Sequence, residues 1–171
     1  MNTQPAPAED NFASHIEAAL ARYFGFLRAW GYGPFEQEQA AREAHFVCRR
    51  PDGVQLRIGY EFIVSTSLNV QVAGEWIEAL EPGNAELAAC HRRRQRLYAV
   101  LSDRYLKTQA TSVWTRLRRR YARFGRALNE RYLRECAEVL RRHPGVLAGD
   151  AAALAGLRAL GDARAQAEHT K

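Results

Sequence analysis

Apolar residues recur at every third or fourth position along two stretches of the chain, the spacing that gives a helix one buried face. The first stretch covers residues 12–30 and is followed by a Gly-Tyr-Gly-Pro turn sequence. The second covers residues 112–142, stays in phase across Gly125 and stops at a His-Pro-Gly sequence. These patterns predict an N-terminal helix and one long helix in the C-terminal half.

Between these stretches the pattern changes to strict alternation of apolar and polar residues. Alternation is complete over residues 54–63 and recurs over 41–50 and 67–73, with a Pro-Asp-Gly turn between the first two segments in chain order. Period two is the mark of a strand with one buried face. We therefore predict a three-stranded antiparallel meander, whose apolar face needs a helix to cover it.

Three shorter elements complete the helical prediction. Residues 76–80 form a short amphipathic turn that a Pro-Gly pair stops. Asn84 is a suitable N-cap for a helix that runs to about residue 107, and Asp150 for an Ala- and Leu-rich helix over 151–160. The fold class that results is α+β.

Length and composition predict one globular domain. A chain of 171 residues with 47% hydrophobic residues builds one substantial core and is short for two. We expect this domain over residues 12–160, with a disordered lead-in over 1–11 and a frayed tail over 161–171. No stretch reaches the roughly 20 apolar residues of a bilayer span, and the first residues lack a secretory pattern. With three widely spaced cysteines interpreted as reduced thiols, a cytoplasmic protein is expected.

The segment over residues 23–35 holds six aromatic rings, and not all of them belong to the inward stripe of the first helix. Phe24 and Phe26 lie off that stripe. Either the helix is buried on two sides or some rings form an exposed partner surface. We favour burial on two sides, which places the first helix between the sheet and the C-terminal helices.

Charge is distributed unevenly along the chain. Residues 86–145 carry sixteen Arg and Lys against five Asp and Glu, whereas residues 1–85 carry six against eleven. The formal net charge of the whole chain is +6. The basic half is therefore where an acidic partner would bind.

Two arginine clusters lie on the two consecutive helices of this basic half. On the long helix they fall on the side away from Trp114, Tyr121 and Phe124, and an antiparallel arrangement brings both clusters together. Further along, we expect opposite charges at i,i+4 to pair, as in Arg131 with Glu135; Arg134 with Glu138 and Glu138 with Arg142 have the same spacing. The candidate partner-binding residues are Arg92, Arg93, Arg96, Arg116, Arg119, Arg120, Arg123 and Arg126.

Three interpretations of this arginine face stay open. Its charges are solvated, or neutralised by the acidic segment within the fold or across a homodimer. Alternatively the face binds an acidic protein, or nucleic acid, in which guanidinium groups contact phosphates. The interleaved aromatic residues Trp114, Tyr121 and Phe124 are expected to be buried in the core, since their spacing continues the apolar stripe.

The sequence contains no recognisable catalytic or cofactor motif. His45 and Cys48 are three apart in a predicted strand and so point to opposite faces, and the adjacent Cys90 and His91 have poor geometry for a metal. Phosphate-binding glycine loops are absent. We therefore expect no enzyme, metal or cofactor, although an acid–base pair assembled from distant residues is left open.

The layout of the chain resembles small uncharacterised bacterial α+β proteins, some of which resemble toxin-immunity proteins. The resemblance covers residues 12–150. It rests on Phe26, Leu27, Trp30, Gly31 and Tyr32 at the end of the first helix, on the strands Arg57–Glu61 and Leu68–Val72, and on the closing run Gly145–Asp150. It brings no functional residues with it. For a basic chain, it implies a protein partner with an acidic surface.

These observations predict a non-enzymatic bacterial binding protein, immunity-like or regulatory. It would dock an acidic macromolecular partner through the arginine-rich helical face. The alternative is a nucleic-acid-binding protein that uses the same arginines, whose affinity would fall steeply with salt.

Overall fold

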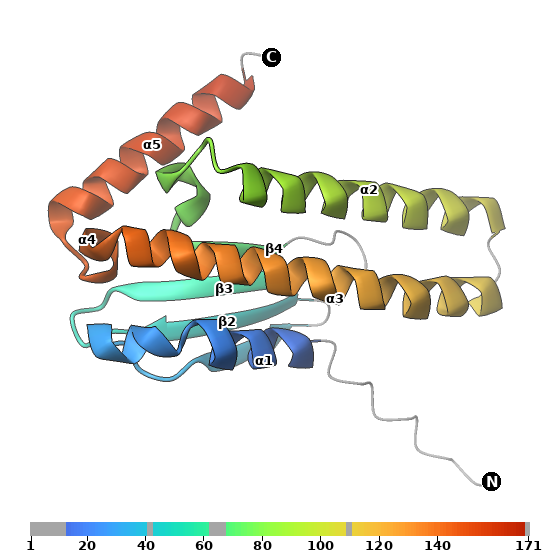
Figure 1. Ribbon diagram of the computed structural model, residues 1–171, viewed down its shortest axis with the longest axis horizontal. Helices are drawn as coiled ribbons and strands as arrows, with labels where there is room; N and C mark the ends of the chain where they lie inside the picture. Colours follow the sequence, from blue (N-terminus) through green and yellow to red (C-terminus); the bar gives the residue numbers. More distant parts are fainter. Residues whose placement is uncertain (1–12, 41–42, 62–67, 109–110, 170–171) are drawn as a thin grey trace, which may run out of the picture.

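The computed structural model describes residues 13–40, 43–61, 68–108 and 111–169 (Figure 1). For residues 39, 40, 101, 102, 104–108, 111–123, 168 and 169 it describes the backbone alone. The elements in chain order are α1 (Ser14–Tyr23), η1 (Gly25–Trp30), β1 (Glu36–Ala40), β2 (Glu43–Arg49), β3 (Gln55–Glu61), β4 (Leu68–Val72), β5 (Glu75–Trp76), η2 (Ile77–Leu80), α2 (Ala85–Thr108), α3 (Thr111–Arg142), α4 (Pro144–Leu147) and α5 (Ala151–His169), in which η marks a 3-10 helix.

The structure confirms the α+β class and enlarges the sheet. The described strands form one antiparallel sheet in the order β1-β2-β3-β4-β5, with each strand paired to its sequence neighbour. The three predicted strands correspond to β2, β3 and β4, so the prediction of a three-stranded sheet was incomplete. The missed β1 has the sequence Glu-Gln-Glu-Gln-Ala, which shows no apolar alternation because an edge strand needs little buried surface.

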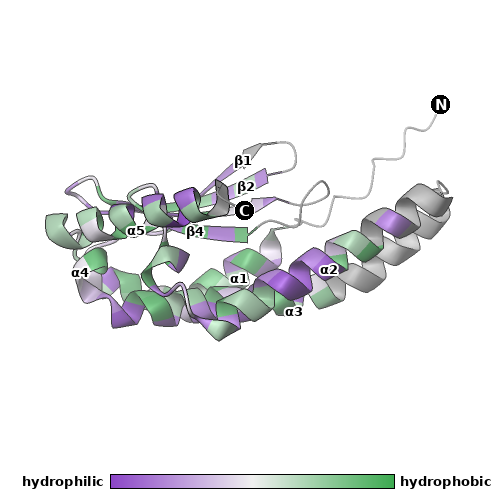
Figure 2. Ribbon diagram, turned by 90° about the horizontal axis from the view of Figure 1, so that it is seen from above, coloured by the Kyte–Doolittle hydropathy of each residue, from purple (hydrophilic) through white to green (hydrophobic). Residues whose placement is uncertain are grey.

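Helices cover one face of the sheet (Figure 2). In the register of the sheet, Phe46 pairs with Ile58 and Ile58 with Val70, and all three side chains are buried. They belong to one apolar cluster with Ile16 of α1 and Leu133 of α3. The apolar face of the meander therefore forms the core together with α1 and the C-terminal half of α3.

The predicted helix over residues 12–30 is two elements. The α-helix ends at Tyr23 and a 3-10 helix follows, which changes the helical phase and turns Phe24 and Leu27 inward. Phe24 contacts Phe26 and Phe35, and the guanidinium of Arg141 lies 4.3 Å from the centre of the Phe26 ring. The aromatic rings of this segment therefore pack against other residues of the protein.

The expected position of the first helix was also wrong. We expected it between the sheet and the C-terminal helices, but α1 lies beside α3 in the same layer (Figures 1 and 2). The side-by-side packing is tied by Tyr23, whose hydroxyl donates to Glu130 at 2.8 Å, and by Arg22, which pairs with the same carboxylate at 2.6 Å.

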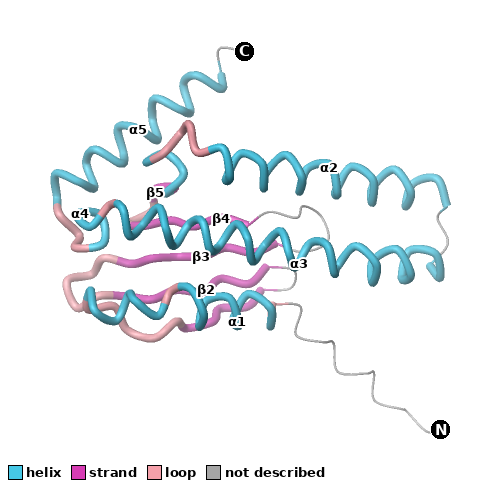
Figure 3. Tube along the Cα trace, viewed as in Figure 1, coloured by secondary structure: helices cyan, strands magenta, loops and turns pink. Residues whose placement is uncertain are grey.

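α2 and α3 form an antiparallel hairpin that runs on past the ends of the strands (Figure 3). Asn84 caps α2 as predicted, because its side-chain oxygen accepts from the backbone N–H groups of Glu86 and Leu87 at 3.1 Å each. α3 is a single helix across Gly125, and a Cβ at that glycine would lie 3.8 Å from Leu97 of α2. Gly125 and Leu97 therefore mark where the two helices face each other.

α5 is longer than predicted. Asp150 caps it by accepting from the N–H of Ala153 at 2.8 Å, as expected, but the helix continues to His169. Most of the predicted frayed tail is therefore helical, and α5 packs against η2 and β5. The predicted lead-in over residues 1–11 lies outside the described residues. No helix in the described ranges is long and apolar enough to cross a membrane.

Candidate arginine-bearing binding site

The structure brings both predicted arginine clusters onto one hairpin. Arg92, Arg93 and Arg96 on α2 are exposed, as is Arg126 on α3. The remaining predicted residues belong to α3, in a part for which only the backbone is described; they are Arg116, Arg119, Arg120 and Arg123.

Helix geometry decides which of the exposed residues share a side of the hairpin. Leu97 and Gly125 face each other, and successive helical residues are rotated by about 100°. In two antiparallel right-handed helices, the residues one position before each facing residue point to the same side. Arg96 and Phe124 therefore lie together, whereas Arg126, one position after Gly125, lies on the opposite side.

The side that carries Arg96 points away from the sheet. Leu133 and Ala137 project from the other side of α3, and both are buried in the core. We call the side of the hairpin that carries Arg92, Arg93, Arg96 and Phe124 the outer face. Phe124, which we expected in the core, is 57% exposed there.

The predicted arginines with described side chains differ in their partners from Arg131, Arg141 and Arg142 of the same hairpin. Within the described part of the chain, Arg92, Arg93, Arg96 and Arg126 form no ion pair. The acidic segment that we considered as their neutralising partner is used elsewhere. It pairs Glu75 with Arg158, Glu78 with Arg164 and Glu81 with Arg142.

The predicted i,i+4 pairs on α3 are replaced by other pairs. Arg131 pairs with Glu86 across the hairpin, and Glu138 pairs with Arg141 one turn along. Arg142 reaches Glu135 at 3.1 Å and both oxygens of Glu81 at 2.8 Å. Arg131 and Arg142 each form a bidentate contact with a carboxylate from another element, Glu86 and Glu81 respectively.

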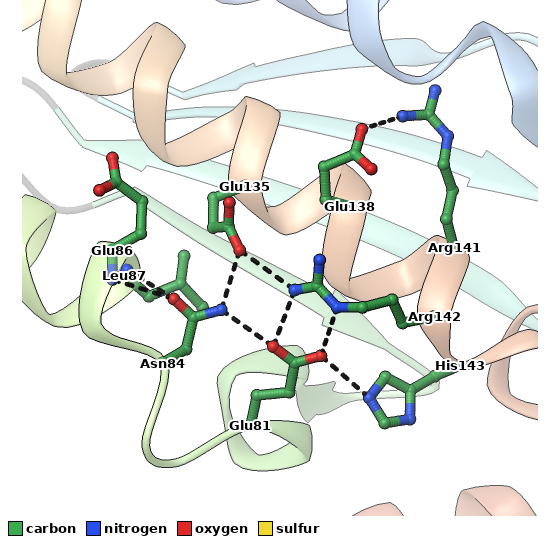
Figure 4. A network of polar contacts seen from close by, with 9 residues as sticks. All are labelled: Glu81, Asn84, Glu86, Leu87, Glu135, Glu138, Arg141, Arg142 and His143. Carbon is green, nitrogen blue, oxygen red and sulfur yellow. Dashed lines mark hydrogen bonds and ion pairs between the residues drawn. The ribbon is translucent and has the colours of Figure 1, made fainter.

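Figure 4 shows the contacts around Glu81. Its carboxylate accepts from Arg142, from the side-chain amide of Asn84 at 2.9 Å and from His143 at 3.3 Å. Hydrogen bonds from Arg142 and Asn84 outweigh the effect of burial and lower the pKa of Glu81 to about 2. The same Asn84 amide bonds Glu135 at 2.9 Å, so the start of α2 is fixed to the end of α3.

A second polar cluster is built around Glu78 of η2, which is 5% exposed. His91 Nε2 lies 2.7 Å from its carboxylate, Tyr132 donates its hydroxyl to the same oxygen, and Arg164 lies 3.3 Å from the other oxygen. Burial alone would raise the pKa of Glu78, but hydrogen bonds from His91, Tyr132 and Arg164 lower it to about 2. An ionised carboxylate accepts only, so His91 donates through Nε2.

A cavity of about 300 Å³ lies beside this cluster, between η2, α2 and α5. Glu78 and His91 line it together, which is the geometry of an acid–base pair assembled from distant residues. Both oxygens of Glu78 are already bonded to the protein. None of the described side chains that line the cavity is Ser, Thr or Cys; they are Glu78, Glu81, Pro82, Asn84, Leu87, Ala88, His91, Arg164 and Ala167. The arrangement therefore serves to join η2, α2, α3 and α5.

Arg94 belongs to the α2 cluster in sequence but not in space. Its side chain is buried, with 6% exposure, and its guanidinium lies 4.9 Å from the centre of the Tyr132 ring. Nε and Nη2 are buried without a hydrogen-bond partner. Burial lowers the pKa of this guanidinium. Arg94 is therefore not available to a docking partner.

The cysteines and the remaining histidine motifs are internal. Cys48, Cys90 and Cys136 are free and buried, and burial raises the pKa of each thiol. His45 bonds Glu43 at 3.2 Å on the face of β2 opposite to Cys48, as the strand period predicts. The described residues contain no group of three or more His, Cys, Asp or Glu placed to hold a metal ion.

Sequence reasoning missed the Glu78 cluster. Glu78 is 13 residues from His91, 54 from Tyr132 and 86 from Arg164, and no local pattern links positions so far apart. The available signal was a lone Glu inside the short apolar run over residues 76–80. No family model, curated protein or solved structure matches the chain.

Proposed function

We propose that this is a non-enzymatic binding protein of the cytoplasm that docks an acidic macromolecular partner, in the first place a protein, through the outer face of the α2–α3 hairpin. An immunity-like or regulatory role fits this mode of action. The partner approaches under the attraction of the basic half of the chain, and carboxylates then pair with the guanidinium groups of Arg92, Arg93 and Arg96.

One observation carries the proposal: Arg92, Arg93 and Arg96 of the outer face form no ion pair within the described residues, whereas arginines near η2 and α5 pair with carboxylates. Arg142, Arg158 and Arg164 each contact a carboxylate of the acidic segment. The hairpin arginines lie where that segment does not reach. Unpaired cations side by side repel one another, and an acidic partner removes this repulsion.

Nucleic acid is the alternative partner. The exposed ring of Phe124 favours it, since an aromatic side chain beside arginines offers a surface on which bases stack. Phosphate binding predicts an affinity that falls by orders of magnitude between about 50 and 200 mM salt. A protein complex with an apolar centre loses less.

The test is a matched pair of charge reversals. Arg96→Glu changes the hairpin, and Arg28→Glu makes the same change of charge at an exposed arginine of η1. Partners captured from bacterial lysate at the two salt concentrations are identified, and mixed single- and double-stranded nucleic acid is tested by electrophoretic mobility. We expect Arg96→Glu to remove a saturable protein partner that Arg28→Glu retains.

Two results would contradict this expectation. Equal retention of every partner by both variants would show that the outer face does not bind. Binding of nucleic acid that collapses with salt and with Arg96→Glu would replace the protein partner by the alternative.

A further inference from the structure

The outer face of the hairpin carries exposed apolar side chains as well as arginines. Phe124 is 57% exposed and Val100 is 39% exposed. Large apolar side chains at this exposure leave much of their apolar surface in water, so their position relative to the arginines indicates what binds there.

Val100 and Phe124 lie on the same side of the hairpin. Val100 is three positions after Leu97, and a rotation of about 300° brings it to the side of Arg96, near the line where the helices meet. The same rule places Leu128, three positions after Gly125 and half-buried, beside Phe124. Val100, Phe124 and Leu128 therefore form one apolar strip along the outer face, which we call the outer strip.

The ion pair between Glu86 and Arg131 is an independent check of this geometry. Glu86 lies eleven positions before Leu97, and Arg131 lies six after Gly125. The rotation of about 100° per residue puts Glu86 close to the line where the helices meet and Arg131 on the outer face, on the side of Phe124. The structure pairs them there. This ion pair closes the outer strip at the end nearer to the body of the protein.

Arginines flank the outer strip on the α2 side. Arg96 lies one turn before Val100 and Arg92 lies further out on the same face, whereas Arg93 lies nearer the line where the helices meet. A ligand that satisfies this surface needs an apolar row in its centre and carboxylates along one flank. Residues at i, i+3, i+4 and i+7 of an amphipathic helix supply the row, and acidic residues beside the row supply the flank.

We propose that the outer strip is the docking site for an acidic amphipathic helix of a protein partner. The inference rests on the proposed function and names the element of the partner that is bound. Aliphatic Val100 and Leu128 favour this occupant over single-stranded nucleic acid, because aliphatic side chains provide no flat surface for a base.

Two synthetic peptides of about 15 residues test the proposal. One places Leu at i, i+3, i+4 and i+7 with Glu on the flank; the other has the same composition in an order that destroys the apolar row. Binding to the full chain is measured by fluorescence anisotropy at about 50 and 200 mM salt. We expect the ordered peptide to bind at least about tenfold more tightly, as one or two buried side chains provide.

Variants of the chain measure how much single side chains contribute to peptide binding. Phe124→Ala and Val100→Ala should each weaken the ordered peptide by about fivefold to tenfold and leave the scrambled peptide unchanged. Tyr98→Ala is the matched control, since Tyr98 is also exposed, at 37%, but lies one position after Leu97 and hence on the opposite side. Tyr98→Ala should leave the affinity for both peptides unchanged.

The outcomes distinguish this inference from the proposed function. Equal binding of the two peptides, or no effect of Phe124→Ala, overturns the helix-docking site. If Arg96→Glu still removes acidic partners in that case, the arginine face stands as the binding surface. Failure of the ordered peptide to bind at all also overturns the inference. If, in addition, Arg96→Glu changes no partner, the proposed function fails too.

Discussion

The two ends of the α2–α3 hairpin use the same residue type in opposite ways. At the end near the sheet, Arg131, Arg141 and Arg142 each have a carboxylate partner that comes from another element or the neighbouring turn. Further along, Arg92 and Arg96 extend into solvent and have no ion pair among the described residues.

The difference shows that the role of an arginine here depends on what the tertiary structure places beside it. η2 and the start of α2 bring Glu78, Glu81 and Glu86 to the end near the sheet. Further along the hairpin, no carboxylate among the described residues forms an ion pair with Arg92 or Arg96. The arginines at the end near the sheet therefore make structural contacts, and those further along are available to a partner.

The largest effect is expected from Glu78→Ala. This change leaves His91, Tyr132 and Arg164 without their shared acceptor, and loss of one partner from a buried charge cluster costs about 3 to 5 kcal/mol. Glu36→Ala, at an exposed pair with Arg49, should cost less than about 1 kcal/mol. Urea unfolding measures both; equal effects would mean that the cluster does not join the elements.

The second prediction concerns pH. The folded pKa of Glu78 is about 2, below its ordinary value of 4.5. Its contribution to stability is therefore present above pH 4.5 and is lost as the pH falls towards 2. A pKa shift of this size corresponds to about 3 kcal/mol of unfolding free energy.

The measurement is the difference in unfolding free energy between the unmodified chain and Glu78→Gln, followed from pH 6 to pH 3. We expect this difference to shrink as the pH falls, because the Glu78 carboxylate of the unfolded chain takes up a proton near pH 4.5 while that of the folded chain stays ionised. A difference that stays constant would show that folding does not shift the pKa of Glu78.

The third prediction concerns Arg94. Its replacement by Met removes two buried donors without acceptors, each of which costs about 1 to 3 kcal/mol, and gives up one contact with the Tyr132 ring. We expect a net gain of about 1 kcal/mol in unfolding free energy. A loss of stability in thermal unfolding would show that the ring contact outweighs the unpaired donors.

The smallest effect on stability is expected on the outer face. The double change Arg92→Ala and Arg96→Ala should alter the unfolding free energy by less than about 0.5 kcal/mol, because neither side chain is buried or paired within the described residues. Circular dichroism during thermal unfolding measures it. A clear loss of stability would assign these arginines to the fold instead of to a partner.

The elements that the sequence predicted well have a sustained local pattern. α3 begins and ends within one residue of the predicted 112–142, since its apolar spacing continues over the whole helix. The caps at Asn84 and Asp150 were also found, because capping depends on a few adjacent residues.

The missed features depend on contacts between distant residues. β1 pairs through its backbone and needs no apolar side chains, and β5 has two residues, too few for a pattern. Phe124 continues the apolar spacing of α3, but the rotation relative to Gly125 turns it outward. Arg94 and Arg96 look alike in sequence, and their positions around α2 bury one and expose the other.

The packing of α1 beside α3 has a consequence for how the chain folds. Tyr23 and Glu130 are 107 residues apart, and His15 and Asn129 are 114 apart, so this contact closes a loop of most of the chain. The α2–α3 hairpin, by contrast, forms from neighbours in sequence and needs no such closure. During synthesis, the apolar face of β2–β4 therefore stays without its α3 cover until the ribosome has made the C-terminal half.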